Sequence, residues 1–316
     1  MLLNALPNIL RIIILFVTLQ AYPQTAFYDG TQTLIGQIQY GIVDENCNDL
    51  HDLARQYNIG FDALLHANPH LNAETIPQPG MVIYIPNQTI LPQQLNPNTI
   101  YVNLPEKRLF FYDAKQHRLW IFPVGVGRLD HATPRGHMYV TQKRYRPTWN
   151  VPAGVLAEAY VNGYIDHPKI MPAGPNNPLG DYAIHLSANS YLIHATHNPD
   201  LIGTRNTSGC INLYPEHLAF LFKKISVSTP VEILNIPLKM HYSNHTFYVE
   251  RHPIYHLTKI DQTDFDEHLY HTNNLHQMIN FHSQNQKKPH SNSLHLDKTK
   301  PILQDARGFP VVALTE

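Results

Sequence analysis

The sequence predicts an α+β protein in which a mainly β domain follows a small βααβ unit. From residue 98 to residue 235, short segments of alternating apolar and polar residues are separated by turn signals that contain Gly and Pro. That pattern is typical of a mainly antiparallel β domain. Residues 38–86 instead combine two helical repeats with a strand at each end, and residues 87–97 form a linker rich in Pro, Gln and Asn.

The N-terminal segment, residues 1–26, has the features of a secretory signal peptide. Arg11 supplies a positive charge before the apolar stretch 12–17, which is too short to span a bilayer comfortably. Ala21 and Ala26 are small residues that offer cleavage points. The alternative is an uncleaved N-terminal anchor, and both interpretations place the bulk of the protein outside the cytoplasm.

Two short helices are expected within residues 38–86. Apolar residues recur at helical spacing in both. They are Leu50, Leu53, Ala54 and Tyr57 in the first helix and Phe61, Leu64 and Leu65 in the second. Asp49 can cap the first helix, and Pro69 ends the second because proline cannot continue it. A closing strand is expected at 82–86, and the small size of the unit favours a binding module.

Seven strands and one helix are expected in the larger domain and its turns. The expected strands are residues 100–104, 108–112, 120–127, 138–141, 182–186, 191–194 and 231–234. The helix is expected at residues 215–224, where Leu218, Leu221 and Phe222 would face inward. A C-terminal extension, residues 236–316, is expected to be partly helical. Its candidates for a buried face are Leu269, Leu275 and Met278.

Composition excludes several function classes. The formal net charge is −1 and charged residues make up only 15%, so no basic stripe indicates a nucleic-acid partner. The 21 histidines are scattered, and neither an H-E-x-x-H motif nor a Cys/His pair with zinc-ligand spacing occurs. We therefore expect no metal and no organic cofactor.

Cys210 is the candidate nucleophile, and His194 is the favoured base. The flanking Ser208 and Gly209 remove bulk, so a substrate carbonyl could lie against successive backbone N–H groups, as in an oxyanion hole. A free thiol has a pKa of about 8.5 and needs a nearby base or backbone dipoles to become a thiolate. His194 ends an apolar strand, where a histidine is otherwise awkward, whereas His185, His197 and His217 are competitors with equally ordinary surroundings. The second cysteine, Cys47, lies in a polar loop of the small unit, so a disulfide with Cys210 is not expected.

Residues 193–213, with the sequence IHATHNPDLIGTRNTSGCINL, resemble the signature of the YkuD-type L,D-transpeptidases. That signature runs His-Gly-Thr, then Ile-Gly, then Ser/Thr-His-Gly-Cys, and its spacing fits His194 and Cys210. Further similar segments are 102–105, 123–127, 133–136, 147–149, the long loop 171–180 and the C-terminal 307–311. The resemblance implies a YkuD-like β-sandwich over 98–235.

The resemblance also implies roles for individual residues. Cys210 would attack the carbonyl of the third residue of a peptidoglycan stem tetrapeptide, His194 would take its proton, and the Ala195 carbonyl would orient the imidazole. D-Ala would leave, and an amine would resolve the thioester. Backbone N–H groups of Cys210 and Gly209, with Ser208 as a further donor, would hold the oxyanion. Arg205, Asn212 and Thr196 are candidates for substrate binding, or else structural hydrogen-bonding residues.

Two positions depart from the family pattern. Ser208 stands where the family has His, and Ala195 stands where Gly or Ser is usual. Ala195 can still offer its carbonyl. Ser208 removes a neighbouring imidazole, which is expected to lower the rate without abolishing catalysis.

The small unit resembles a LysM domain over residues 49–57, 64–69 and 79–86. This resemblance implies affinity for the glycan of peptidoglycan, and the alternative is a structural spacer. The sequence does not determine which acceptor resolves the thioester. The candidates are a second stem, the lysine of an outer-membrane lipoprotein, or water in a hydrolase of the same fold. The long loop and the C-terminal extension resemble those of members that anchor the lipoprotein, which favours that acceptor. With the export signal, the resemblance implies a periplasmic location. A non-catalytic wall-binding protein is the alternative of a different class.

Overall fold

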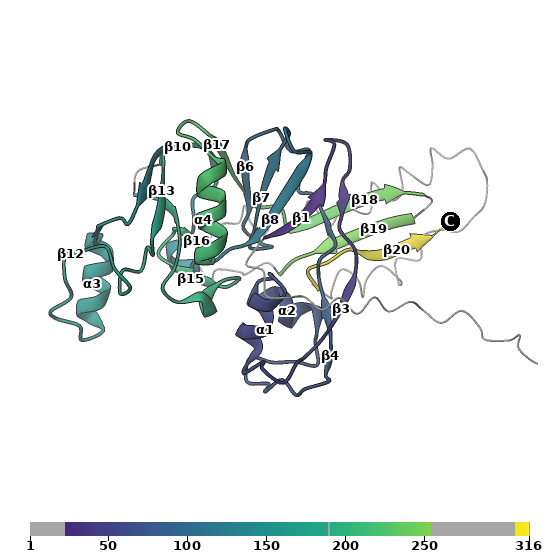
Figure 1. The fold of residues 1–316 in the computed structure, drawn as a ribbon, viewed down its shortest axis with the longest axis horizontal. Helices are drawn as coiled ribbons and strands as arrows, with labels where there is room; N and C mark the ends of the chain where they lie inside the picture. Colours follow the sequence, from purple (N-terminus) through teal and green to yellow (C-terminus); the bar gives the residue numbers. More distant parts are fainter. Residues whose placement is uncertain (1–22, 189, 245, 254–306, 316) are drawn as a thin grey trace, which may run out of the picture.

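The computed structural model describes residues 23–188, 190–244, 246–253 and 307–315 (Figure 1). The predicted apolar stretch 12–17 lies outside these residues, as do Leu269, Leu275 and Met278. In the part that is described, every helix is too short or too polar to cross a membrane.

Nine strands form the principal sheet, in the order β1-β8-β7-β6-β17-β10-β13-β14-β16. Their bounds are β1 Gln24–Phe27, β6 Ile100–Asn103, β7 Arg108–Asp113, β8 Arg118–Pro123, β10 Gly136–Tyr145, β13 Tyr182–Leu186, β14 Leu192–His194, β16 Ile211–Asn212 and β17 Pro230–Leu234. Most neighbouring strands are antiparallel, as predicted, but β17 pairs with β6 and β14 pairs with β16 in parallel.

Helix α4 (Pro215–Lys224) packs on the principal sheet (Figure 1). Its first residue is Pro215, which suits the first turn because that turn leaves its N–H groups without helical partners. Leu218 and Leu221 are buried in the same core as the inward residues of the strands, and Phe222 packs against that core while half-buried. The predicted helix and its inward face are therefore confirmed.

The small unit has the predicted βααβ order. It consists of β3 Gln39–Ile42, α1 Leu50–Gln56, α2 Phe61–Ala67 and β4 Val82–Ile85, and β3 pairs antiparallel with β4. Asp49 caps α1 as expected, because its carboxylate accepts hydrogen bonds from the N–H groups of His51 and Asp52. With the mainly β domain that follows, this unit confirms the predicted fold class.

The predicted linker, residues 87–97, is packed rather than free. Strand β5 (Thr89–Ile90) lies in it and pairs antiparallel with β2 (Leu34–Ile35). Leu91 and Leu95 are buried beside Tyr28. The apolar residues of this stretch therefore pack on the principal sheet, in one cluster with Tyr101 and Phe110.

The last residues of the predicted signal segment, 1–26, belong to a strand in the structure. Gln24, Thr25 and Ala26 pair with residues 119–121 of β8, so they belong to the edge of the principal sheet. A strand of four residues next to a longer apolar segment gives too short a pattern to recognise from the sequence.

The described part of the C-terminal extension is a sheet, not a helix. Strands β18 (Leu238–Ser243), β19 (Thr246–Arg251) and β20 (Val311–Thr315) form a three-stranded antiparallel sheet. The expectation of a partly helical extension is not tested by these residues. Its candidate helical positions fall between 254 and 306, outside the described part of the chain.

The remaining elements are short. They are β9 Val126–Gly127 with β15 Arg205–Thr207, β11 Trp149–Asn150 with β12 Ile170–Met171, helix α3 Ala153–Val161, and the 3-10 turns η1 Leu129–His131 and η2 Pro199–Leu201. The sequence analysis did not predict α3, whose buried residue is Ala159.

Candidate active site

The parallel pairing of β14 with β16 places the segment of Cys210 beside the strand that ends at His194. His194 is the last residue of β14 and pairs with Asn212, while Cys210 immediately precedes β16. Continuing that register sets Cys210 next to Leu192, two residues before His194 on the neighbouring strand. Ile193 and Ile211, which lie between them, are buried in the core.

A constrained turn presents Cys210. Gly209 has φ of +103°, and a Cβ there would come within 2.7 Å of the Tyr191 ring, so only glycine fits. The hydroxyl of Thr207 donates to the Cys210 carbonyl oxygen and accepts from the Gly209 N–H. Sequence reasoning missed Thr207. A Thr two residues before a turn glycine is a known local signal, but it does not by itself indicate a site.

The thiol of Cys210 is protonated at rest near neutral pH. Its side chain is half-buried, with Sγ 3.9 Å from the Ser190 carbonyl oxygen. Burial raises the pKa of the Cys210 thiol, and a backbone hydrogen bond at Leu192 offsets only part of that effect. A neutral thiol of this kind would need a base in order to act as a nucleophile.

His194 is a buried, neutral imidazole. It is only 7% exposed, and its Nδ1 forms a hydrogen bond with the Ala195 carbonyl oxygen. Burial lowers the pKa of His194 to about 4, although the bond to Ala195 opposes that shift and the nearby His197 adds to it. Because a carbonyl only accepts, Nδ1 must carry the proton, which leaves Nε2 as the basic nitrogen.

The three predicted oxyanion and orienting residues have different surroundings. The Ala195 carbonyl faces His194 as expected, and Ala195 itself packs against Gly180 of the long loop. Ser208 is exposed at the tip of the turn. The Gly209 N–H is already donated to Thr207, over 3.2 Å. An oxyanion would have to displace that hydroxyl to use the Gly209 N–H.

Each of the three candidate substrate-binding residues forms hydrogen bonds within the protein. Arg205 donates to the Gly127 carbonyl oxygen over 3.2 Å, so it ties β15 to β9. Thr196 is buried and exchanges hydrogen bonds with the backbone of Asn198. Asn212 donates to the Asn206 side chain over 3.2 Å, while its own Oδ1 is buried without a partner.

The competing histidines are less suited to act on Cys210. His197 is exposed beyond the end of β14. His185 pairs with Leu192 in the neighbouring strand, and burial lowers its pKa. His217 is fully buried on α4 with Nε2 2.9 Å from Oδ1 of Asn58, so it is engaged with the small unit.

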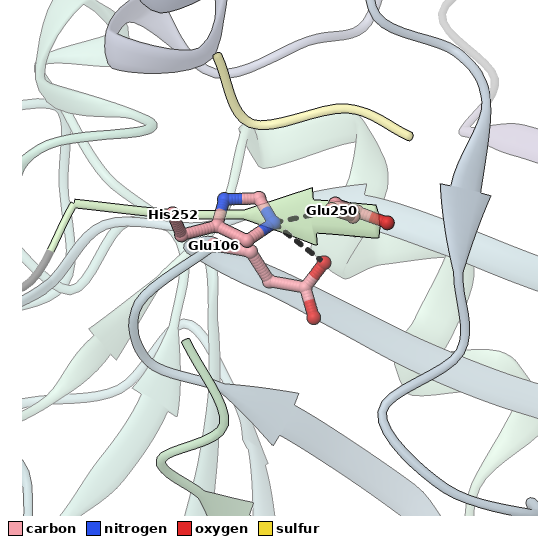
Figure 2. A group of neighbouring side chains, drawn as sticks. All are labelled: Glu106, Glu250 and His252. Atoms are coloured by element: carbon pink, nitrogen blue, oxygen red, sulfur yellow. Dashed lines mark hydrogen bonds and ion pairs between the residues drawn. The ribbon is translucent and has the colours of Figure 1, made fainter. Parts of the chain in front are cut away.

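A second ionisable cluster lies away from Cys210 and is the candidate metal site. Figure 2 shows Glu106, Glu250 and His252, which alone among the described residues offer three ligand atoms within 4.8 Å of one another. However, Lys239 Nζ lies 2.7 Å from Glu106 and 2.9 Å from Glu250, and Arg108 lies within 3.6 Å of both carboxylates. Two cations already balance the two carboxylates, so the cluster is a buried ion-pair network that joins β19 to the β6–β7 turn.

Removing a cation from this network is expected to destabilise the fold. Burial opposes the charge on Glu250, but Lys239, His252 and Arg108 together hold the pKa of Glu250 well below its ordinary value. Lys239→Met would strip one of the two cations from fully buried carboxylates and is expected to lower the free energy of unfolding by about 3–5 kcal/mol. Denaturant titration measures this.

Lys224→Met is the matched control for that change. Lys224 pairs with Asp113 over 3.0 Å near the surface, so its loss should change the free energy of unfolding by less than about 1 kcal/mol. Equal effects of the two substitutions would show that Lys239 does not compensate the buried carboxylates.

Two family profiles match the chain. The L,D-transpeptidase catalytic domain matches residues 97–233, which include Cys210 and His194, and the LysM domain matches residues 49–86.

Three Escherichia coli proteins are among the similar relatives. The probable L,D-transpeptidase YcfS is 37% identical over 211 residues, covering 66% of this chain and 65% of that protein. YbiS, also described as a probable L,D-transpeptidase, is 35% identical over 213 residues, covering 67% of this chain and 68% of that protein. ErfK/SrfK is 35% identical, covering 65% of this chain and 66% of that protein. The match thus spans slightly less than two thirds of YcfS.

Solved L,D-transpeptidases also align with the structure, but weakly. The Enterococcus faecium enzyme aligns with a TM-score of 0.34 at 19% identity, over 50% of this chain and 57% of that one. This alignment adds nothing to the sequence comparison.

Proposed function

The chain belongs to the L,D-transpeptidase family, and from that membership we propose that it is a cysteine acyltransferase acting on peptidoglycan stem tetrapeptides. The observation that carries the proposal is the pairing of β14 with β16, which places Cys210 and His194 on adjacent segments, with Nδ1 of His194 on the Ala195 carbonyl. A half-buried thiol and a base with one fixed tautomer are the two groups that acyl transfer through a thioester needs.

In the first half-reaction, Nε2 of His194 accepts the thiol proton as Cys210 Sγ bonds to the carbonyl carbon of the third stem residue. The peptide C–N bond then breaks, and the D-Ala amine leaves with the proton held by His194. A thioester between Cys210 and the shortened stem remains. In the second half-reaction, an acceptor amine gives its proton to His194 and attacks the thioester. The C–S bond breaks, and the Cys210 thiolate recovers the proton.

The protonation states of Cys210 and His194 before substrate binds determine at which step the thiol loses its proton. Because burial raises the pKa of Cys210 and lowers that of His194, a thiolate–imidazolium pair is disfavoured before substrate binds. Proton transfer and nucleophilic attack then occur together, driven by the developing oxyanion. We assign the oxyanion to the N–H groups of Cys210 and Ser208, since that of Gly209 is engaged with Thr207.

The pH dependence of acylation is expected to follow the lowered pKa of His194. Its neutral, basic form is present above its pKa of about 4, so the rate should stay constant from pH 7 down to about pH 5 and fall only below that. The measurement is kcat/KM for D-Ala release from pH 4 to pH 9. A half-point near the ordinary histidine pKa of about 6.5 would contradict a buried neutral base.

The small LysM unit would bind the glycan strand, and the acceptor would be a second stem or the lysine of an outer-membrane lipoprotein. Export to the periplasm follows from the substrate. Of the two candidate cleavage points, a cut after Ala21 leaves β1 intact, whereas a cut after Ala26 removes three of its four residues.

The test of the proposed function is incubation of the purified protein with tetrapeptide-bearing muropeptides. A transpeptidase releases D-Ala and yields a crosslinked dimer, or a conjugate when a lysine-containing lipoprotein peptide is the acceptor. Release of D-Ala with only a tripeptide product would indicate a hydrolase. No reaction at all would favour a wall-binding protein without catalytic activity.

A further inference from the structure

The small LysM unit contacts the segment that connects His194 to Cys210. The Phe61 N–H, at the start of α2, donates to the Ile202 carbonyl oxygen over 3.2 Å. Beside this bond, the backbones of Gly60 and Gly203 lie in direct contact. A Cβ on Gly203 would come within 2.2 Å of Gly60 Cα, and a Cβ on Gly60 would come within 2.8 Å of Gly203 Cα. Ile202 is 1% exposed, so this contact is closed to solvent.

Between Gly203 and the backbone of Cys210, a short series of hydrogen bonds fixes the chain. The carbonyl of Thr204 accepts from the Val126 N–H, and β15 then pairs with β9. Asn206 donates to the Leu201 carbonyl, and the hydroxyl of Thr207 binds the Cys210 carbonyl. Each of these hydrogen bonds is made by the backbone or by a short side chain. A displacement of Gly203 is therefore expected to displace Cys210 as well.

The small unit also holds the helix that follows Cys210. Asn58 contacts the buried His217 of α4 over 2.9 Å. Arg55 forms two hydrogen bonds with Glu216 over 3.1 and 3.0 Å. The contacts with the small unit therefore lie on both sides of the turn that contains Cys210.

We propose that the small LysM unit positions the nucleophile through its contacts with the segments on both sides of Cys210, Gly60–Gly203 and Asn58–His217, in addition to any glycan that it binds. The proposal rests on Cys210 being the nucleophile of the proposed function. Gly60 touches no reacting group, so it is a positioning residue. Because Gly60 has no side chain, the segment 195–209 can approach the small unit closely. Misplacement of a reacting atom by about 1 Å can lower a rate by about 10²-fold, so this contact can matter for rate without mattering much for stability.

Gly60→Ala is the direct test. Gly60 has φ of −79°, so alanine fits its backbone and acts only by pushing on Gly203. The control is Gly154→Ala, an exposed glycine of α3 with nothing within 4 Å of the added Cβ. The substrate is a soluble tetrapeptide without glycan, so that glycan binding does not enter. Acid-quenched mass spectrometry then gives the rate constant and the amplitude of Cys210 acylation in a single turnover.

We expect Gly60→Ala to lower the acylation rate constant about tenfold or more at full amplitude, with an unchanged pH half-point, and Gly154→Ala to match the parent. A purely structural role would instead reduce the amplitude, because fewer molecules would be folded. Wild-type rate constants in Gly60→Ala would overturn the proposal. If Gly60→Ala does not fold, Asn58→Gly decides: it keeps the positive φ of 54° accessible, removes the contact with His217, and should also lower the rate constant. An unchanged rate constant in that variant would overturn the proposal, whereas failure of the unaltered protein to become acylated would refute the proposed function instead.

Discussion

Cys210→Ala is expected to reduce D-Ala release from a tetrapeptide donor to background while leaving the fold intact. The thioester requires the sulfur atom, and alanine carries no nucleophile in its place. Alanine fits the half-buried position without overpacking and keeps the backbone of the turn, including the hydrogen bond from Thr207. The measurements are D-Ala release and the midpoint of thermal unfolding.

Cys47→Ala is the matched control for this substitution. Cys47 lies in the small unit, where its thiol donates to the Asp49 carbonyl oxygen, and neither cysteine is in a disulfide in the structure. Activity should be unchanged in this variant. Full turnover in Cys210→Ala would refute the assignment, and a Cys47–Cys210 disulfide found by peptide mapping of active enzyme would replace it with a redox switch.

His194→Ala is expected to slow acylation by about 10²–10⁴-fold, the usual contribution of a general base. Ser208→Ala should cost far less, because Ser208 is exposed and alanine preserves its backbone N–H. The measurement is the acylation rate constant across pH for each variant. His194→Ala should also lose the acid limb below pH 5, since the group that titrates there is gone.

Ser208→His restores the residue that is usual in the family and should be tolerated, with a rate equal to or above that of the parent. Equal loss in Ser208→Ala and His194→Ala would make the hydroxyl part of the proton relay. The division of roles between these two residues would then have to be reversed or shared.

Elements with a strong local pattern could be predicted from the sequence. The alternating segments at 100–104 and 108–112 became β6 and β7, and the helix at 215–224 has the predicted bounds. The Asp49 cap was also predictable, because capping depends on a residue and the two N–H groups that follow it. In these elements, short-range geometry and long-range packing favour the same conformation.

Strands too short to show an alternating pattern could not be predicted. β1, β15 and β16 are two to four residues long, and each depends on a partner strand far away in sequence. Helix α3 buries little of its surface, so it lacks the apolar stripe that identifies a helix.

The candidate residues His194 and Cys210 could be named from the signature in the sequence, but their surroundings could not be predicted. The lowered pKa of His194 depends on burial by the surrounding strands, and the Gly60–Gly203 contact depends on how two domains pack. Neither burial nor domain packing is encoded within the segment that carries the motif.

The central claim, that Cys210 carries the acyl group, is tested most directly by mapping the covalent intermediate. The purified protein is mixed with a tetrapeptide donor without an acceptor, quenched in acid and digested, and the peptides are analysed by mass spectrometry. The account predicts one adduct, the mass of the tripeptide acyl group, on the peptide that contains Cys210, formed at the same rate as D-Ala appears. An adduct on another residue, or release of D-Ala at full rate while Cys210 stays unmodified and freely alkylated, would contradict it.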